Sequence, residues 1–380
     1  MLTFEHTPLL TAVKTLKKVM DTRTPIPVMQ HVTVTSDAFG RAVLTASDLE
    51  SWLSLTVEGS HCESGDTDFT VSRADLEKVL TGGDKGKLVT MSVDHGRNRD
   101  GAVKVQHDDI KVDLDILPLA DFPEAPAVTD TVHVPMSCST ARDVLTYCAG
   151  AMSTEETRYY LKGVYLHQYD DTGKLAAVST DGHRLNLAET GICYDGAGVI
   201  IRDDAVKLLI DLIGKSDSAV QWHLPQASAV IRVTGDGWNL VTRKINGTFP
   251  NYKRVIPRDT KGKGTLSCEK VSKAAARIAR ITSKQGAAIL DITAGQVRHA
   301  GTGDGIKALS IDAGDMFPSG DIVPVGINPV YLEKAMSQIK VFSDTCTVHV
   351  TDESTPLRIH PRQLPCWAEN MTSVIMPMRY

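Results

Sequence analysis

Three stretches of this chain follow one pattern, and this repeat constrains the fold more than any other feature of the sequence. In each stretch a strand-like run, a turn and a second strand-like run precede a small polar pair that ends in Asp. The pairs end at Asp48, Asp181 and Asp304, so they recur at intervals close to a third of the 380 residues. A unit of this length is far too long for a solenoid repeat and has the size of a domain. The sequence therefore predicts three weakly similar domains.

A second repeated marker places the boundaries of these domains. Phe122 and Phe249 each precede a proline. The interval between the two phenylalanines is again close to a third of the chain, and the C-terminus follows Phe249 by nearly the same interval. We expect domains over residues 1–127, 128–256 and 257–380.

Each predicted domain contains two segments with helical spacing of apolar residues, and short alternating runs make up most of the remainder. The turns between these runs have the length of hairpin turns, which favours antiparallel sheets. The sequence therefore predicts an α+β fold in which two helices per domain pack on antiparallel sheets. The expected helices cover residues 7–20, 72–80, 139–152, 202–215, 270–284 and 328–340.

Charge is distributed unevenly between the helices and the rest of the chain. The net charge of the chain is −5. The expected helices carry +9 of charge, which leaves −14 for the strands and loops. The cations of the first and fifth helices are Lys14, Lys17, Lys18, Lys270, Lys273, Arg277, Arg280 and Lys284.

Two interpretations of this charge pattern remain open. Charged runs on helices are often ordinary solvated faces, and the helices of the middle domain are neutral. Sorted charge on an acidic protein also suits a molecule with one face for a polyanion and another face that repels it.

Composition excludes several classes of protein. No run of 18 apolar residues is present, so we expect no membrane span. The first ten residues lack the pattern of a signal peptide, and the seven cysteines form no C-x-x-C pair. We therefore expect a cytoplasmic chain with reduced, packing cysteines, without a zinc module or a disulfide framework.

Asp181 and His183, in the segment STDGHR, are the strongest catalytic candidates, because an Asp-x-His pair can orient an imidazole for base catalysis. In a strand these two side chains would share a face, but the sequence does not position a nucleophile relative to them. The glycine-rich segments 81–87 and 301–305 lack the spacing and the following helix of a phosphate loop. No two of the twelve histidines have metal-ligand spacing. We therefore expect no enzyme, no cofactor and no metal site.

Five segments of the chain resemble the bacterial DNA sliding clamp, the beta subunit of DNA polymerase III. They are LPLADFP (117–123), TRYYLKG (157–163), VSTDGHRL (178–185), GTFPNYKRVIP (247–257) and VIMPMRY (374–380). They occur in the order of the family and extend over most of the chain. The resemblance implies a head-to-tail homodimer that closes into a ring of six domains, with helices inside and sheets outside.

Such a ring encircles double-stranded DNA and slides along it without reading the sequence, because its cations contact phosphates only. The resemblance places four residues near the DNA at the face of the ring, and the charge pattern adds cations of the inner helices. Core packing remains an equal alternative for the tyrosine pair. The expected DNA contacts are Arg23, Arg158, Tyr159, Tyr160, Lys14, Lys17, Lys270, Lys273 and Arg277.

The resemblance also implies a groove between the second and third domains. This groove receives short linear peptides of the clamp loader, DNA polymerases and repair proteins. Its apolar residues and its methionines suit varied partners. The residues implied are Leu161, Thr180, Gly182, His183, Arg184, Leu185, Pro250, Arg254, Val255, Val374, Met376, Pro377 and Met378, with Pro356 nearby.

At the dimer contact the resemblance implies an edge strand near Val112 and Leu114, which would meet a helix of the partner chain near Arg280 and Ile281. Val112 is smaller than the aromatic residue expected there, and Arg280 replaces an apolar residue. Tyr380 stands where Leu is usual. The departures at Val112 and Arg280 predict a looser or more salt-dependent ring, and Tyr380 is expected to alter the rim of the peptide groove.

Two other functions remain open from the sequence. One is a hydrolase or transferase that uses Asp181 and His183. The other is an adaptor with a clamp fold that binds partner peptides without encircling DNA, which the neutral helices of the middle domain favour.

Overall fold

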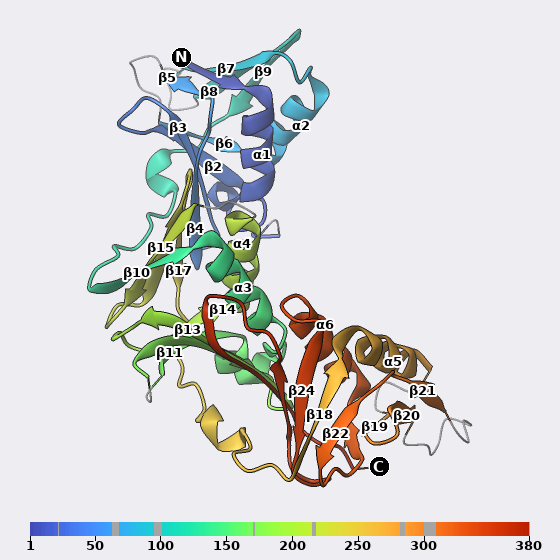
Figure 1. The fold of residues 1–380 in the computed structure, drawn as a ribbon. Helices are drawn as coiled ribbons and strands as arrows, with labels where there is room; N and C mark the ends of the chain where they lie inside the picture. The colour runs from blue at the N-terminus through green and yellow to red at the C-terminus, as the bar shows by residue number, and fades with distance from the viewer. Residues whose placement is uncertain are drawn as a thin grey trace. The chain divides into compact units, whose positions relative to one another are not determined.

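The fold is taken from a computed structural model of the chain (Figure 1). Four features of the sequence analysis lie outside the described residues, namely Lys284, Asp304, the segment 301–305 and Tyr380. The structure describes residues 1–21, 23–62, 68–94, 101–169, 172–214, 218–281, 286–299 and 309–379.

The chain divides into two compact units. Unit 1 consists of Met1–Cys138 and Asp211–Lys244, and unit 2 consists of Ser139–Ile210 and Ile245–Tyr380. Each unit combines most or all of one outer predicted domain with part of the middle one. The division into three domains stays a prediction.

Every one of the six expected helices is present, so the α+β prediction is confirmed. Capping residues explain two of the helix starts. Ser72 Oγ accepts the N–H of Asp75 before the second helix, and Asn328 Oδ1 accepts the N–H of Val330 before the sixth. The helices are α1 (His6–Leu16), α2 (Arg73–Gly82), α3 (Cys138–Ala149), α4 (Asp203–Ile213), α5 (Cys268–Ile281) and α6 (Pro329–Lys340).

The described residues of unit 1 form two antiparallel sheets. The first has the order β5-β1-β7-β8-β9, with β1 (Leu2–Glu5), β5 (His61–Cys62), β7 (Leu88–Asp94), β8 (Ala102–His107) and β9 (Ile110–Asp115). The second has the order β10-β15-β16-β17-β4-β3-β2-β6, with β2 (His31–Ser36), β3 (Ala42–Ser47), β4 (Ser51–Thr56), β6 (Phe69–Ser72), β10 (Thr131–Ser137), β15 (Ala219–Pro225), β16 (Val230–Gly235) and β17 (Trp238–Arg243). The pairing of β17 with β4 joins strands of the first and middle predicted domains in one sheet.

In unit 2, too, the part of the chain that the structure describes forms two antiparallel sheets. The larger has the order β14-β11-β12-β13-β26-β25-β24-β18-β22, with β11 (Gly163–Tyr169), β12 (Lys174–Thr180), β13 (Arg184–Cys193), β14 (Val199–Arg202), β18 (Gly262–Ser267), β22 (Phe317–Gly320), β24 (Thr345–Val350), β25 (Leu357–Pro361) and β26 (Ala368–Ile375). The smaller has the order β21-β20-β19-β23, with β19 (Ala288–Asp291), β20 (Gln296–His299), β21 (Ser310–Asp312) and β23 (Val325–Ile327). Here the pairing of β13 with β26 joins strands of the middle and last predicted domains.

The strand–turn–strand repeat of the sequence corresponds to three antiparallel hairpins, β2–β3, β11–β12 and β19–β20. In unit 2 a buried polar network connects α3 to the neighbouring strands β13 and β26. Tyr147 Oη lies 2.8 Å from Ser373 Oγ on β26, and Ser373 Oγ donates to Asn186 Oδ1 on β13 at 2.8 Å. Asn186 Nδ2 donates to the carbonyl of Tyr147 at 2.7 Å, which closes the network.

Two histidines of unit 2 couple stability to pH. The rings of His349 in β24 and His360 in β25 meet edge to face, with centroids 5.4 Å apart. Burial and the nearby charge of Arg358 lower the pKa of His349 from 6.5 to about 4, and burial also lowers the pKa of His360. Both groups therefore favour the neutral form in the folded chain.

We expect the free energy of unfolding to decrease as the pH falls from about 6.5 to about 4, because in this range the unfolded chain binds these protons more readily than the folded chain. Urea denaturation at a series of pH values measures this decrease. His349→Gln should make the dependence on pH shallower. An unchanged slope in that variant would contradict the assignment.

Candidate functional site

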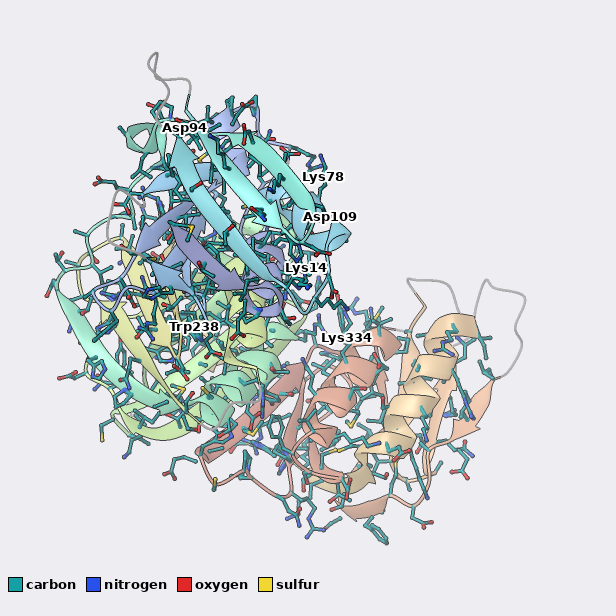
Figure 2. The ribbon with its side chains drawn as sticks, turned by 90° about the horizontal axis from the view of Figure 1, so that it is seen from above. Lys14, Lys78, Asp94, Asp109, Trp238 and Lys334 are labelled. Carbon is teal, nitrogen blue, oxygen red and sulfur yellow. The ribbon has the colours of Figure 1, made fainter. Side chains whose placement is uncertain are left out.

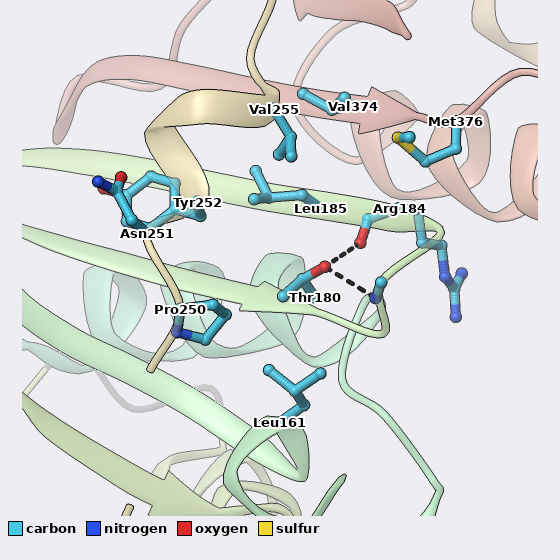
Figure 3. Close-up of a pocket in the computed structure, with 11 residues that line it drawn as sticks. Leu161, Thr180, Arg184, Leu185, Pro250, Asn251, Tyr252, Val255, Val374 and Met376 are labelled. Atoms are coloured by element: carbon cyan, nitrogen blue, oxygen red, sulfur yellow. Dashed lines mark hydrogen bonds between the residues drawn. The ribbon is translucent and has the colours of Figure 1, made fainter. Parts of the chain in front are cut away.

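The turn between β12 and β13 is fixed by the side chains at its start (Figure 3). Thr180 Oγ1 donates to the carbonyl of Arg184 at 2.7 Å and accepts the N–H of Gly182 at 3.1 Å. Asp181 Oδ1 accepts the N–H groups of His183 and Arg184 at 2.9 and 3.0 Å. Gly182 has a φ of +89°, which glycine adopts without steric cost. The polar residues of STDGHR therefore shape the turn.

An apolar cavity of about 210 Å³ lies beside this turn. In Figure 3, Leu161 and Pro250 lie on one side of it, and Val255, Val374 and Met376 lie on the other. Its walls come from two 3-10 turns, η3 (Glu156–Leu161) and η4 (Tyr252–Val255), and from β13 and β26. The lining residues are Leu161, Thr180, Gly182, Arg184, Leu185, Pro250, Asn251, Tyr252, Val255, Val374 and Met376.

A buried aromatic cluster holds one wall of the cavity in place. Tyr252 is buried, and its Oη lies 3.0 Å from Nε2 of the buried His167. The rings of Tyr165 and Phe249 stack at 4.8 Å, and Phe249 meets Tyr252 edge to face. Leu185 belongs to the same buried cluster. The cavity floor is thus part of the core of unit 2.

Polar groups occupy the rim of the cavity. Arg184 Nε donates to Asp181 Oδ2 at 3.0 Å, and the Arg184 guanidinium lies over the ring of Tyr331 on α6, 4.9 Å from its centroid. The imidazole of His183 stacks on the same tyrosine ring at 6.1 Å. Burial and the charge of Asp181 raise the pKa of Tyr331. The carboxylate of Asp181 thus accepts hydrogen bonds from the backbone of the turn and from the side chain of Arg184. In the Asp-x-His pair, Asp181 therefore has a structural role in the turn.

A second cavity of about 640 Å³ adjoins the C-terminal segment. Met376 lines both cavities, so the two meet at this side chain. The residues that line the second cavity are Glu353, Ser354, Met376, Pro377, Met378 and Arg379.

Nine of the thirteen residues expected in the groove line the first cavity, and Pro377 and Met378 line the second. His183 stacks on Tyr331, and Arg254 belongs to η4 beside the cavity wall. Asn251 and Tyr252 also line the cavity but are not among the thirteen predicted residues, although both belong to the segment GTFPNYKRVIP. The structure brings these residues together, and their role in binding peptides stays a prediction.

The expected cationic face of the fifth helix is present on α5. Lys270, Lys273 and Arg277 are exposed at helical spacing on one side of the helix. The helix begins two residues earlier than expected and so includes Glu269, whose carboxylate pairs with Lys273 and with Lys340 Nζ, the latter at 2.9 Å. Hydrogen bonds from these two lysines lower the pKa of Glu269 to about 2. The face is therefore less positive than the sequence predicted, since one carboxylate neutralises part of it.

The cations expected on the first helix are also exposed. Lys14 lies on α1 (Figure 2), and Lys17 follows its last turn. Lys18 Nζ pairs with Asp211 Oδ2 at 2.8 Å. The side chain of Arg23 is 94% exposed.

The two tyrosines expected at the DNA differ in environment. Tyr159 is 52% exposed, whereas Tyr160 packs against the buried cluster under the cavity. Arg158 pairs with Glu155, with 3.4 Å between Nε and Oε2. Core packing therefore describes Tyr160, and Tyr159 remains available at the surface.

The strand expected at the dimer contact lies at a sheet edge. β9 is the last strand of its sheet, and Val112 and Leu114 on it are half-buried. Arg280 and Ile281, at the end of α5, are both exposed. Both elements thus offer free surface, and their pairing between two chains stays a prediction.

Within the described residues no cluster of His, Cys, Asp and Glu could hold a metal ion, and no helix is long and apolar enough to cross a membrane.

Comparison with known proteins identifies the relatives of the chain. The family model for the central domain of the DNA polymerase III beta subunit matches residues 136–251. The beta sliding clamp of Caulobacter vibrioides (strain NA1000 / CB15N) is 28% identical over 361 residues, which cover 89% of this chain and 90% of that protein. These matches indicate that the chain is related to the bacterial beta sliding clamps. The beta sliding clamp of Rickettsia felis is 24% identical over 356 residues, 90% of each chain.

Solved structures of sliding clamps share the fold over the whole length. The Caulobacter crescentus clamp, solved with polyethylene glycol bound to its beta-motif tethering region, superposes with a TM-score of 0.88 at 25% identity, covering 100% of this chain and 98% of that one. The Bartonella birtlesii clamp, bound to griselimycin, gives a TM-score of 0.86 at 26% identity, covering 100% and 99%. The family and fold class expected from the sequence are confirmed.

We expect Asp181→Ala to lower the free energy of unfolding by about 1–2 kcal/mol, because the N–H groups of His183 and Arg184 lose their acceptor. The matched variant His183→Ala should change it by less than about 0.5 kcal/mol, since this side chain is exposed. Urea denaturation measures both values. Equal effects would contradict the structural role of Asp181.

Proposed function

We propose that the chain is a ring-forming processivity factor that encircles duplex DNA and tethers DNA polymerases to it. The observation that carries this proposal is the agreement in fold with sliding clamps over the full length, at a TM-score of 0.88. The chain acts without catalysis: it holds other proteins on DNA in the cytoplasm, as a subunit of a polymerase holoenzyme. The hydrolase hypothesis is not retained.

The DNA contact is electrostatic and reads no bases. Lys270, Lys273 and Arg277 on α5, together with Lys14 and Lys17, face phosphates from inside the ring. Weak and interchangeable phosphate contacts permit sliding, and closure of the ring keeps the clamp on the DNA. The strong negative charge of the strands and loops discourages DNA from binding elsewhere on the molecule.

Two chains complete the ring. The free edge of β9, near Val112 and Leu114, meets the end of α5 and its neighbouring strands in a second chain, near Arg280 and Ile281. Unpaired backbone groups of an edge strand favour such a continuation of the sheet. Each chain then contributes three clamp domains, residues 1–127, 128–256 and 257–380.

The cavity beside the β12–β13 turn binds short peptides of the clamp loader, DNA polymerases and repair proteins. Its apolar walls accept apolar side chains, and Met376 adapts to different ones. The clamp from Bartonella birtlesii was solved with griselimycin, which supplies a probe for this site.

Val255→Asp should weaken the binding of griselimycin at least tenfold, because it places a charge at the wall of the apolar cavity. Isothermal titration calorimetry on the purified chain measures the Kd. Val341→Asp is the matched control, since Val341 is exposed at the end of α6, away from the cavity. Equal weakening in both variants, or none in Val255→Asp, would contradict the location of the site.

The double variant Lys270→Glu and Arg277→Glu should reduce loading onto nicked circular DNA by the clamp loader and ATP at least tenfold, since it replaces two phosphate contacts by repulsion. The control carries the same charge change on Lys261→Glu and Lys263→Glu, which are exposed at β18. Gel filtration of the DNA-bound fraction measures loading.

Normal loading of the α5 variant would favour the adaptor hypothesis, in which a clamp fold binds peptides without encircling DNA. The helices of the middle domain, expected over residues 139–152 and 202–215, carry no net charge, and this keeps the second candidate open.

A further inference from the structure

The turn that borders the cavity of unit 2 has a counterpart in unit 1, between β3 and β4. There Ser47 Oγ accepts the N–H of Leu49 at 3.0 Å. Asp48 Oδ1 accepts the N–H groups of Glu50 and Ser51 at 3.0 and 2.6 Å. The N–H of Asp48 donates to the carbonyl of Ser51 at 3.2 Å. Two side chains at the start of the turn therefore fix its backbone.

Each of these bonds recurs in the turn between β12 and β13. Asp181 takes the place of Asp48, and its N–H likewise donates across the turn, to the carbonyl of Arg184 at 3.4 Å. The residue after the aspartate has a positive φ in both turns, +73° at Leu49 and +89° at Gly182. The first turn keeps this backbone even with a leucine, although positive φ is sterically unfavourable for leucine. The two turns are therefore copies of one structure.

The strands that leave the two turns are paired in the same register. Trp52 on β4 lies opposite Val241 on β17, and Leu185 on β13 lies opposite Val374 on β26. Leu185 follows Trp52 in the sequence, and Val374 follows Val241, by the same number of residues by which Asp181 follows Asp48. Trp52 in unit 1 therefore occupies the position that Leu185 occupies on the wall of the open cavity.

One more backbone bond continues the correspondence beyond these pairs. The N–H of Arg243 donates to the carbonyl of Glu50 at 2.8 Å, and the N–H of Met376 donates to the carbonyl of His183 at 2.8 Å. Arg243 thus corresponds to Met376, which lines the cavity.

The proline of the cavity wall is repeated as well. Pro250 lines the cavity, and Pro123 is its counterpart in unit 1, since each proline directly follows one of the two repeated phenylalanines. Val255 of the cavity wall and Val128 stand equally far after these two prolines. Unit 1 therefore contains corresponding positions for the walls on both sides of the cavity.

The two copies differ in what fills the centre. Trp52 is only 4% exposed, and its Nε1 donates to the carbonyl of Pro123 at 2.9 Å. Trp52 forms a buried cluster with Val230 and Val241, against which Val128 packs, and the guanidinium of Arg243 lies over the Trp52 ring, 5.8 Å from its centroid. In unit 2 the leucine at the same position is too small to reach across, and a cavity of about 210 Å³ remains.

We infer that the chain carries two copies of the peptide groove, and that one side chain decides which copy is open. Trp52 closes the copy in unit 1 by occupying the space that an apolar side chain of a bound peptide fills in unit 2. Leu185 leaves the copy in unit 2 open, and the size of its side chain determines how large an apolar group the cavity can accept. This inference rests on the proposed role of the cavity in unit 2 for its functional meaning, but the arrangement of the two copies can be tested separately.

A reciprocal exchange tests the inference with a probe that needs no peptide. Xenon binds to empty apolar cavities and is located in crystals by its anomalous scattering. We expect xenon beside Leu185 in the unsubstituted chain, beside both Leu185 and position 52 in Trp52→Leu, and beside neither in Leu185→Trp. Leu185→Trp should also weaken the binding of griselimycin at least 100-fold, whereas Trp52→Leu should leave its Kd unchanged.

The outcomes separate this inference from the proposed function. Xenon absent from position 52 in Trp52→Leu, or a cavity that stays open in Leu185→Trp, would overturn the inference. If Trp52→Leu does not fold, Leu185→Trp alone decides, because closing the cavity adds buried contacts. A chain that shows the expected xenon pattern but does not bind griselimycin would support the inference and contradict the proposed groove.

Discussion

The pairing of β13 with β26 is the interaction on which the candidate site depends. These two strands lie far apart in the sequence. Their pairing joins the strands β14-β11-β12-β13 to the strands β26-β25-β24-β18-β22 in one nine-stranded sheet. Buried hydrogen bonds among Tyr147 on α3, Asn186 on β13 and Ser373 on β26 stabilise the same strand pair. Because Leu185 and Val374 face each other in this register, the apolar walls of the cavity meet only when the pairing forms. A slip by one residue would turn these side chains to the other face of the sheet.

Charge supplies the second constraint, and it acts over a longer range than the sheet. The exposed cations of α5 stand on a chain with a net charge of −5. Such a distribution attracts a polyanion to one face without fixing its position. Glu269 moderates this face by pairing with two lysines, and its lowered pKa keeps it ionised far below neutral pH. A weak and adjustable attraction is the property that a sliding contact requires.

Much of this arrangement could be predicted from the sequence, because periodicity and capping residues act locally. The helices begin and end within a few residues of the expected positions, and Asn328 explains one start directly. Motif resemblance located most of the cavity lining. The contribution of Tyr252 was missed because it depends on a tertiary contact with His167. Packing between distant segments also decides that Tyr160 is partly buried while Tyr159 is exposed, and that Trp52 fills the space in unit 1. Sequence spacing alone does not determine such packing.

The most direct measurement of the central claim is the retention of the purified protein on nicked circular DNA, loaded with a clamp loader and ATP, before and after the circle is cut. A closed ring is held by topology, so we predict stable retention on the circle and rapid loss from the linear ends at unchanged salt. Equal retention on circular and linear DNA would mean binding by affinity alone. That result would contradict the assignment of this chain as a clamp that encircles DNA.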